Sequence, residues 1–171
     1  MMFYQLEKTQ KIPKSIKQVW DFISSPYNLQ KITPSYMGFE IISKNQTEKI
    51  YPGMIICYKV SPLPGIKMSW VTEITHVKEM EFFVDEQRIG PYSMWHHQHR
   101  IESIEDGVLM TDIVTYKPPL GILGRFLNQI FIETQLEKIF NFRETAFENI
   151  FGNIPLQNKY RIKQCGIDLE H

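Results

Sequence analysis

Residues 92–117, YSMWHHQHRIESIEDGVLMTDIVTYK, contain two strand-like runs separated by a tight turn. The turn is Glu105-Asp106-Gly107, and an Asp-Gly pair between two such runs is a strong signal for a β-hairpin. A connection this short joins antiparallel neighbours. The stretch therefore predicts antiparallel strands at residues 92–103 and 107–117.

Further strands are predicted on the N-terminal side of this hairpin. The clearest spans residues 66–77, in which Met68, Trp70 and Thr72 face one way and mostly polar residues face the other. Turn residues, such as those of Tyr51-Pro52-Gly53, separate the remaining runs. The predicted strands before the hairpin are 2–12, 38–43, 54–60, 66–77 and 80–87.

Helical patterns occur in two places along the chain. Ser15 followed by Gln18 forms a capping box before an apolar stripe, and Ser25-Pro26 begins a second short helix. Apolar residues then recur at helical spacing over residues 123–151. We therefore predict an α+β fold. A curved, antiparallel seven-stranded sheet wraps around a long C-terminal helix, and two short helices follow the first strand.

The length of 171 residues fits one domain, which we place at residues 1–152. Residues 153–168 are predicted to form a loosely held tail. The final Leu169-Glu170-His171 is typical of an expression-tag remnant. Nothing in the sequence predicts an oligomer larger than a weak homodimer, so we expect a monomer or a weak homodimer.

Composition excludes several classes of function. Lys+Arg and Asp+Glu both number 19, so the formal net charge is zero and nucleic acid is not a predicted partner. No apolar run approaches the ~20 residues of a membrane span, so stable membrane insertion is not expected. The two cysteines and the absence of a signal-peptide pattern predict a cytoplasmic protein.

The order of elements and a set of local motifs resemble the START/polyketide-cyclase superfamily, also called SRPBCC or helix-grip. The motifs are Gly90-Pro91-Tyr92, Trp95-His96-His97-Gln98-His99-Arg100, Met110-Thr111-Asp112-Ile113-Val114-Thr115-Tyr116, Pro119-Leu120-Gly121 and Leu123-Gly124-Arg125. They are similar to a bacterial branch labelled cell-division-inhibitor-like or ligand-binding. The superfamily contains lipid carriers, hormone receptors and ring cyclases. The resemblance therefore implies a cavity between sheet and long helix, and does not by itself name a reaction.

The strand at 92–103 carries the candidate polar site. Arg100 and Glu102 share one face, which we expect to meet solvent. The opposite face carries Trp95, His97 and His99 and should meet the cavity. Asp112 of the next strand is expected beside the two histidines. Three interpretations stay open: a structural or ligand-orienting cluster, a general acid–base pair, and a metal site in which Asp112 is the third ligand.

We predict that the chain binds a small hydrophobic or amphipathic molecule, with no cofactor and no metal. The predicted ligand-binding residues are Met68, Trp70, Thr72, Trp95, His97, His99, Asp112, Tyr116, Leu127 and Ile130. One alternative is a cyclase, dehydratase or isomerase that transfers protons through His97, His99 and Asp112. The other is a regulatory protein-interaction module. The sequence favours the non-enzymatic binder over both.

Overall fold

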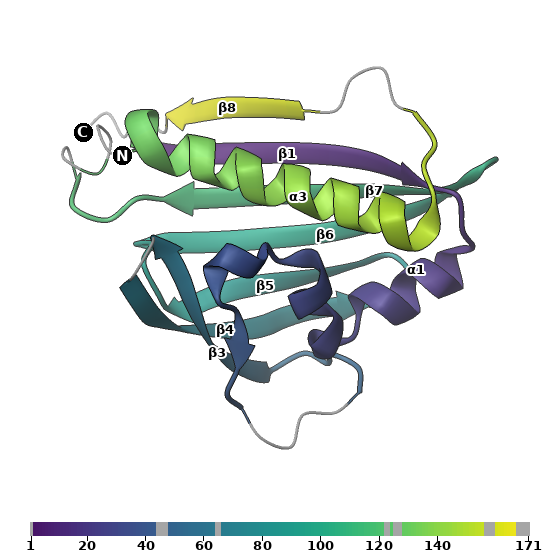
Figure 1. Ribbon diagram of the computed structural model, residues 1–171, viewed down its shortest axis with the longest axis horizontal. Coiled ribbons are helices and arrows are strands. Elements are labelled where there is room, and N and C mark those ends of the chain that lie inside the picture. The colour runs from purple at the N-terminus through teal and green to yellow at the C-terminus, as the bar shows by residue number, and fades with distance from the viewer. Residues whose placement is uncertain are drawn as a thin grey trace.

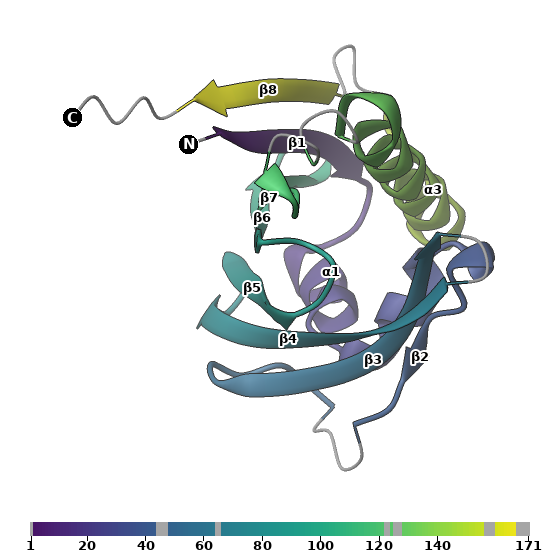
Figure 2. The ribbon, with the colours of Figure 1, turned by 90° about the vertical axis from the view of Figure 1, so that its left-hand side faces the viewer.

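A computed structural model describes residues 2–43, 48–63, 66–121, 124, 128–155 and 160–166. Within these residues, eight strands form one antiparallel sheet with the order β2-β3-β4-β5-β6-β7-β1-β8. The sheet curves strongly, and the helices lie on its concave side (Figures 1 and 2). The strands are β1 Met2–Ile12, β2 Glu40–Ile41, β3 Met54–Leu63, β4 Ile66–Lys78, β5 Phe82–Ile89, β6 Met94–Ile104, β7 Gly107–Lys117 and β8 Tyr160–Gly166.

All seven predicted strands are present, and the predicted α+β helix-grip fold is confirmed. Strand β2 is shorter than expected, with only two residues in the ladder to β3. Strand β5 begins later than residue 80, because Met80 has a positive φ of 60° in the turn that precedes it. The tail contains an eighth strand, β8, which pairs with β1. The segment is therefore attached to the sheet through its backbone.

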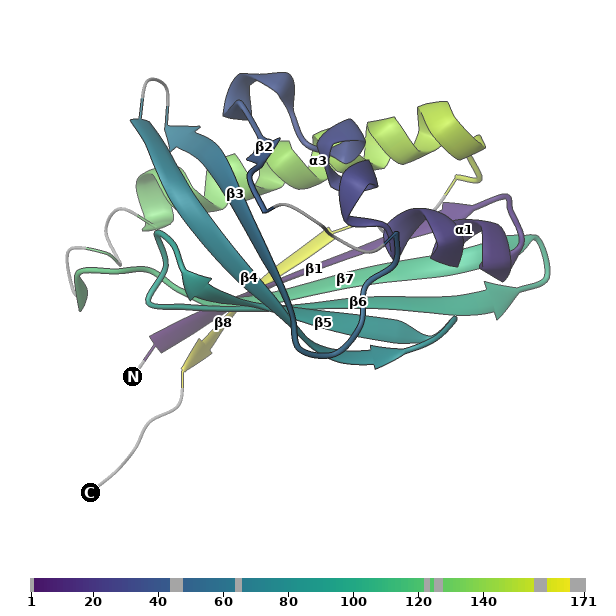
Figure 3. The same ribbon diagram turned by 90° about the horizontal axis from the view of Figure 1, so that it is seen from below.

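Two helical segments follow β1, as predicted. Helix α1, Ile16–Ile23, begins with the complete capping box between Ser15 and Gln18. It buries Val19 and Trp20 against the sheet, while Ile23 is half-buried. The second segment, η1 Pro26–Ile32, is a 3₁₀ helix, and a shorter 3₁₀ turn, η2 Ser35–Met37, follows it. Figure 3 shows these segments and the C-terminal helix on the same side of the sheet.

The long C-terminal helix crosses the concave face of the sheet (Figures 1 and 2). Its described part begins with a π-helical turn, η3 Asn128–Ile132, and continues as α3, Glu133–Phe151. Gly152 ends it with a φ of 96°, a conformation that glycine adopts without strain. The buried stripe of α3 consists of Leu136, Phe140, Arg143 and Phe147.

Apolar packing divides the interior into three clusters. The largest joins α1 to the sheet and to the end of α3, and includes Trp20, Phe83 and Phe147. A second surrounds Tyr116 and Phe140, and a third surrounds Trp70. No helix within the described ranges is long and apolar enough to cross a bilayer.

Candidate functional site

A cavity of about 170 Å³ lies between the concave sheet and α3, and all three apolar clusters contribute to its wall. Most of the wall is aliphatic or aromatic. The polar side chains in the part of the wall formed by the sheet and α3 are Tyr58, Thr72, Asp85, His97, His99 and Arg143. The cavity is therefore an apolar space with a limited set of polar groups, as is usual for small-molecule sites.

Strand β6 supplies two of the polar groups in the predicted orientation. His97 and His99 are 4% and 8% exposed and line the cavity, whereas Arg100 and Glu102 are exposed on the other face. Trp95 also lines the cavity. The alternation of a strand explains this arrangement, because charged residues fix which face meets water.

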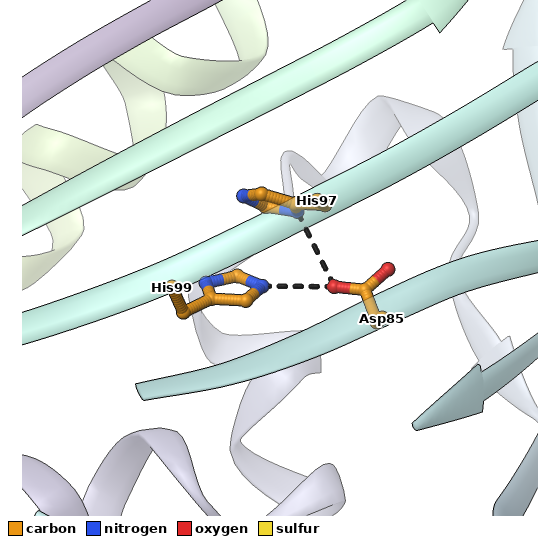
Figure 4. A group of neighbouring side chains, drawn as sticks. All are labelled: Asp85, His97 and His99. Atoms are coloured by element: carbon orange, nitrogen blue, oxygen red, sulfur yellow. Dashed lines mark hydrogen bonds and ion pairs between the residues drawn. The ribbon is translucent and has the colours of Figure 1, made fainter. Parts of the chain in front are cut away.

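Two carboxylates flank these histidines and close a ring of four contacts. On one side, Oδ1 of Asp112 lies 3.1 Å from Nε2 of His97 and 2.7 Å from Nδ1 of His99. On the other, Oδ2 of Asp85 lies 3.4 Å from Nδ1 of His97 and 2.9 Å from Nε2 of His99 (Figure 4). The two imidazole centroids are 3.7 Å apart. All four ring nitrogens thus face a carboxylate oxygen.

Strand register brings the four side chains together. His99 pairs directly with Asp112 across β6 and β7, and His97 pairs directly with Asp85 across β5 and β6. Paired residues on one face of an antiparallel sheet lie within side-chain reach. The cluster is therefore held by three neighbouring strands and does not depend on a loop.

Burial and mutual charge set the protonation of the cluster. Burial lowers the pKa of His97 to about 4, and the neighbouring His99 adds to the effect. Burial also opposes the charge of His99, but Asp112 and Asp85 outweigh it and raise the pKa of His99. Burial would raise the pKa of both carboxyls, yet the histidines outweigh it and lower the pKa of each. At neutral pH, both carboxylates are therefore ionised and His97 is neutral.

Arg143 of α3 is a functional candidate that the sequence analysis missed. It lines the cavity, is 9% exposed, and its guanidinium lies 4.9 Å from the centroid of the Phe140 ring. Its Nε and Nη1 are buried and have no hydrogen-bond acceptor among the described residues. A signal was present in the sequence, because Arg143 falls in the apolar stripe of Leu136, Phe140 and Phe147 at helical spacing.

Asp85 was also missed as a site residue. It shares a parity with Gln87, but residues 80–87 are apolar on both faces, so the sequence did not orient the strand. In the structure, Phe83 and Val84 are both buried although they point to opposite faces. Pairing with β6 places Asp85 in the cavity wall.

Aromatic side chains form one wall of the cavity. Trp70 makes edge contacts with Trp95 and Tyr92, at 5.4 and 5.8 Å between centroids, and stacks on Tyr58 at 6.0 Å. The Tyr58 hydroxyl lies 3.1 Å from Oγ1 of Thr72. Burial raises the pKa of Tyr58 and of Tyr92, so both phenols are neutral and add no charge to the wall.

The predicted ligand-binding residues fall into distinct places. Those in the cavity wall are Trp70, Thr72, Trp95, His97 and His99. Asp112 lies behind the histidines, and Tyr116 is fully buried in its apolar cluster. Met68 packs beside Trp70 without reaching the wall. Ile130 is 59% exposed and outside the wall, and Leu127 lies outside the described residues.

Solved structures with similar folds come from several bacteria. A START superfamily protein from Mycobacterium smegmatis has a TM-score of 0.64 at 15% identity, with 86% of this chain and 99% of that chain covered. A protein from Chromobacterium violaceum has a TM-score of 0.65 at 10% identity, with 88% and 99% covered. A protein from Thermus thermophilus has a TM-score of 0.61 at 12% identity, with 85% and 94% covered. At these identities, the similarity shows the fold alone.

Sequence comparison identifies the family. No curated protein sequence matches the chain. A family model described as polyketide cyclase/dehydrase and lipid transport matches residues 12–140, which is most of the chain. That range runs from the end of β1 into α3, and it includes every residue of the Asp85, His97, His99 and Asp112 cluster. The chain therefore belongs to the polyketide cyclase/dehydrase and lipid transport family.

Proposed function

We propose that this protein binds a small amphipathic molecule, with its apolar part against the aromatic wall and its polar part toward Asp85, His97, His99 and Arg143. The observation that carries the proposal is a largely apolar cavity with a few polar groups, in a family whose description includes lipid transport. Burial would raise the pKa of the Asp85 carboxyl, but His97, His99 and, to a smaller extent, Arg143 lower it, and all four residues line the cavity. The charged groups therefore form one polar region of the wall.

The volume of the cavity limits the size of the ligand. An engineered apolar cavity of about 150 Å³ in another protein holds benzene. The present cavity, about 170 Å³, suits a molecule built on one or two rings, or a short chain. Burying about 200 Å² of apolar surface contributes roughly 5 kcal/mol before ordering costs. A hydrogen bond adds only about 1 kcal/mol net, so the walls should dominate affinity.

Fluorescence titration with 1-naphthylamine, an uncharged two-ring probe within this size limit, tests this proposal. We expect saturable binding, and Trp95→Ala should weaken it roughly sevenfold, because a probe that loses about 50 Å² of contact loses about 1.2 kcal/mol. His99→Gln should weaken it less than about threefold. Tyr51→Ala is the matched control, since Tyr51 is exposed and outside the wall. Absence of saturable binding, or equal effects of Trp95→Ala and Tyr51→Ala, would contradict the proposal.

The second candidate is an enzyme of the cyclase, dehydratase or isomerase kind. The favouring observation is His97, a neutral imidazole held by Asp112 and facing the cavity, because such a group can accept a proton. If His97→Gln abolishes a measured turnover and leaves probe binding intact, the enzyme replaces the binder. The regulatory-module alternative, the cytoplasmic location and the monomeric or weakly dimeric state stay predictions.

A further inference from the structure

We propose that Asp85, His97 and His99 bind a divalent transition-metal ion of the zinc class, with Asp112 holding both histidines in position. The donor atoms are Oδ2 of Asp85, Nδ1 of His97 and Nε2 of His99, which converge on one point at the cavity wall (Figure 4). No metal was predicted from the sequence, and the alternative metal site had Asp112 as its third ligand. The structure instead places Asp112 on the far side of the histidines.

The distances between donor atoms fit a single ion. Zinc lies about 2.0–2.2 Å from nitrogen and oxygen ligands, so two ligands of one tetrahedral ion are roughly 3.3 Å apart. Oδ2 of Asp85 lies 3.4 Å from Nδ1 of His97 and 2.9 Å from Nε2 of His99. All three donor atoms lie within 4.8 Å of one another. Small rotations of the three side chains therefore suffice to bring their donor atoms within bonding distance of one ion.

Counting protons in the cluster shows why a cation fits there. Carboxylates only accept hydrogen bonds, and a neutral imidazole carries one N–H. When both rings are neutral and both N–H groups point to Asp112, the two nitrogens that face Asp85 present lone pairs. One metal ion can then bind both nitrogens together with the carboxylate oxygen of Asp85.

Asp112 provides an independent observation that points to a metal. Histidines that bind metals usually donate their second N–H to a carboxylate or carbonyl, which fixes the tautomer and the ring. One oxygen of Asp112 accepts from the second nitrogen of both histidines, at 3.1 and 2.7 Å. When each ring is neutral, such an arrangement leaves its unprotonated nitrogen directed at Asp85.

The site also opens toward the cavity. Asp85, His97 and His99 line the cavity wall, and Asp112 does not. Imidazole with carboxylate is a donor set suited to zinc, cobalt, iron or nickel rather than to magnesium or calcium. Three protein ligands leave at least one coordination position free, as in zinc sites that bind water or a substrate. The three ligands belong to the wall of the cavity that is assigned to the organic ligand.

Titration of chelator-treated protein with Co²⁺ tests the proposal through the visible d–d absorption of the bound ion. We expect bands that saturate at one equivalent and disappear on addition of Zn²⁺. Asp85→Asn and His97→Gln should each weaken binding more than about a hundredfold, and Asp112→Asn about tenfold to a hundredfold. His96→Gln is the matched control, because His96 lies between the two ligands in sequence and contacts Glu86 instead.

Two outcomes would overturn the metal site. One is the absence of d–d bands in the wild-type protein, and the other is an equal loss in His96→Gln and His97→Gln. Circular dichroism of each variant separates lost binding from lost folding. Zn²⁺ should also raise the thermal midpoint of the wild-type and His96→Gln proteins and leave that of folded ligand variants unchanged. Because no organic ligand is used, a negative result leaves the proposed binding function standing.

Discussion

At the scale of single residues, we expect Arg143 to lower the stability of the ligand-free fold. Its charge is buried beside Phe140, and two of its donors have no acceptor among the described residues. A buried charge without full pairing costs more than an apolar side chain of similar volume. A side chain that weakens the empty protein suggests a role in recognising a ligand with an oxygen-bearing group.

Arg143→Met should therefore stabilise the ligand-free protein. We expect the free energy of unfolding to rise by about 1–2 kcal/mol, because methionine fills a similar space without a charge. Urea denaturation followed by circular dichroism measures the change. Arg143→Lys keeps the charge and should show no such gain. A fall of more than about 1 kcal/mol in the methionine variant would mean that Arg143 is already well paired.

The residues of the site differ in how far the sequence could predict them. The orientation of His97 and His99 followed from the charges of Arg100 and Glu102 on the opposite face. The orientation of Asp85 could not be predicted in this way. Both faces of its strand are buried, so its residues do not alternate between apolar and polar. Arg143 was not predicted as a site residue because a charged residue on an amphipathic helix usually meets solvent.

At the scale of elements, the capping box of α1 was fully predicted from the sequence. The backbone N–H of Gln18 donates to the Ser15 side chain, and the Gln18 side chain accepts from the Ser15 backbone. Both interactions join residues three positions apart, so no distant partner is needed to form them. Elements defined by such local signals, including the strands around Asp106-Gly107, were predictable for the same reason.

Ser15→Ala should lower the free energy of unfolding by about 1 kcal/mol, because the first turn of α1 loses its side-chain acceptor. Ser103→Ala provides the control, since Ser103 is exposed on β6 and caps no helix. Parallel urea titrations compare the two variants. Equal stability of both variants would show that α1 is held by the packing of Val19 and Trp20 rather than by its cap.

Strand β8 could not be predicted from local sequence patterns. Residues 153–168 carry no pattern that distinguishes a strand from a tail, and the strand exists because β1 offers a free edge. The pairing runs from Met2 with Gly166 to Lys8 with Tyr160, so its partner lies at the other end of the sequence. The hydrophobic periodicity within a segment does not predict pairing between segments that are so far apart in the sequence.

At the scale of the whole molecule, β8 covers the sheet edge that β1 would otherwise present. The opposite edge is β2, which has only two residues in the ladder. Short edges and covered edges both limit pairing between molecules. The cavity lies away from β1, the strand with which β8 pairs, since no described residue of β1 belongs to its wall.

Removing residues 156–171 should therefore change association more than binding. The exposed edge of β1 should allow pairing between two copies, seen as a concentration-dependent rise in mass by size-exclusion chromatography with light scattering. Affinity for 1-naphthylamine should stay within about twofold of the full chain. A shortened chain that stays monomeric at high concentration would show that β1 is protected by other means.

The position of β1 between β7 and β8 also has a consequence for how the chain acquires its structure. Tyr4 of β1 pairs with Tyr116 of β7. Strand β1 can therefore pair only after β7, which is synthesised much later. A contact between such distant segments is formed only after a large loss of chain entropy, and proteins rich in such contacts fold slowly, in roughly milliseconds to seconds. During synthesis on the ribosome, the hairpins of β3 to β7 can assemble before β1 joins them. The cavity is then completed last, when α3 has left the ribosome and closes over the sheet.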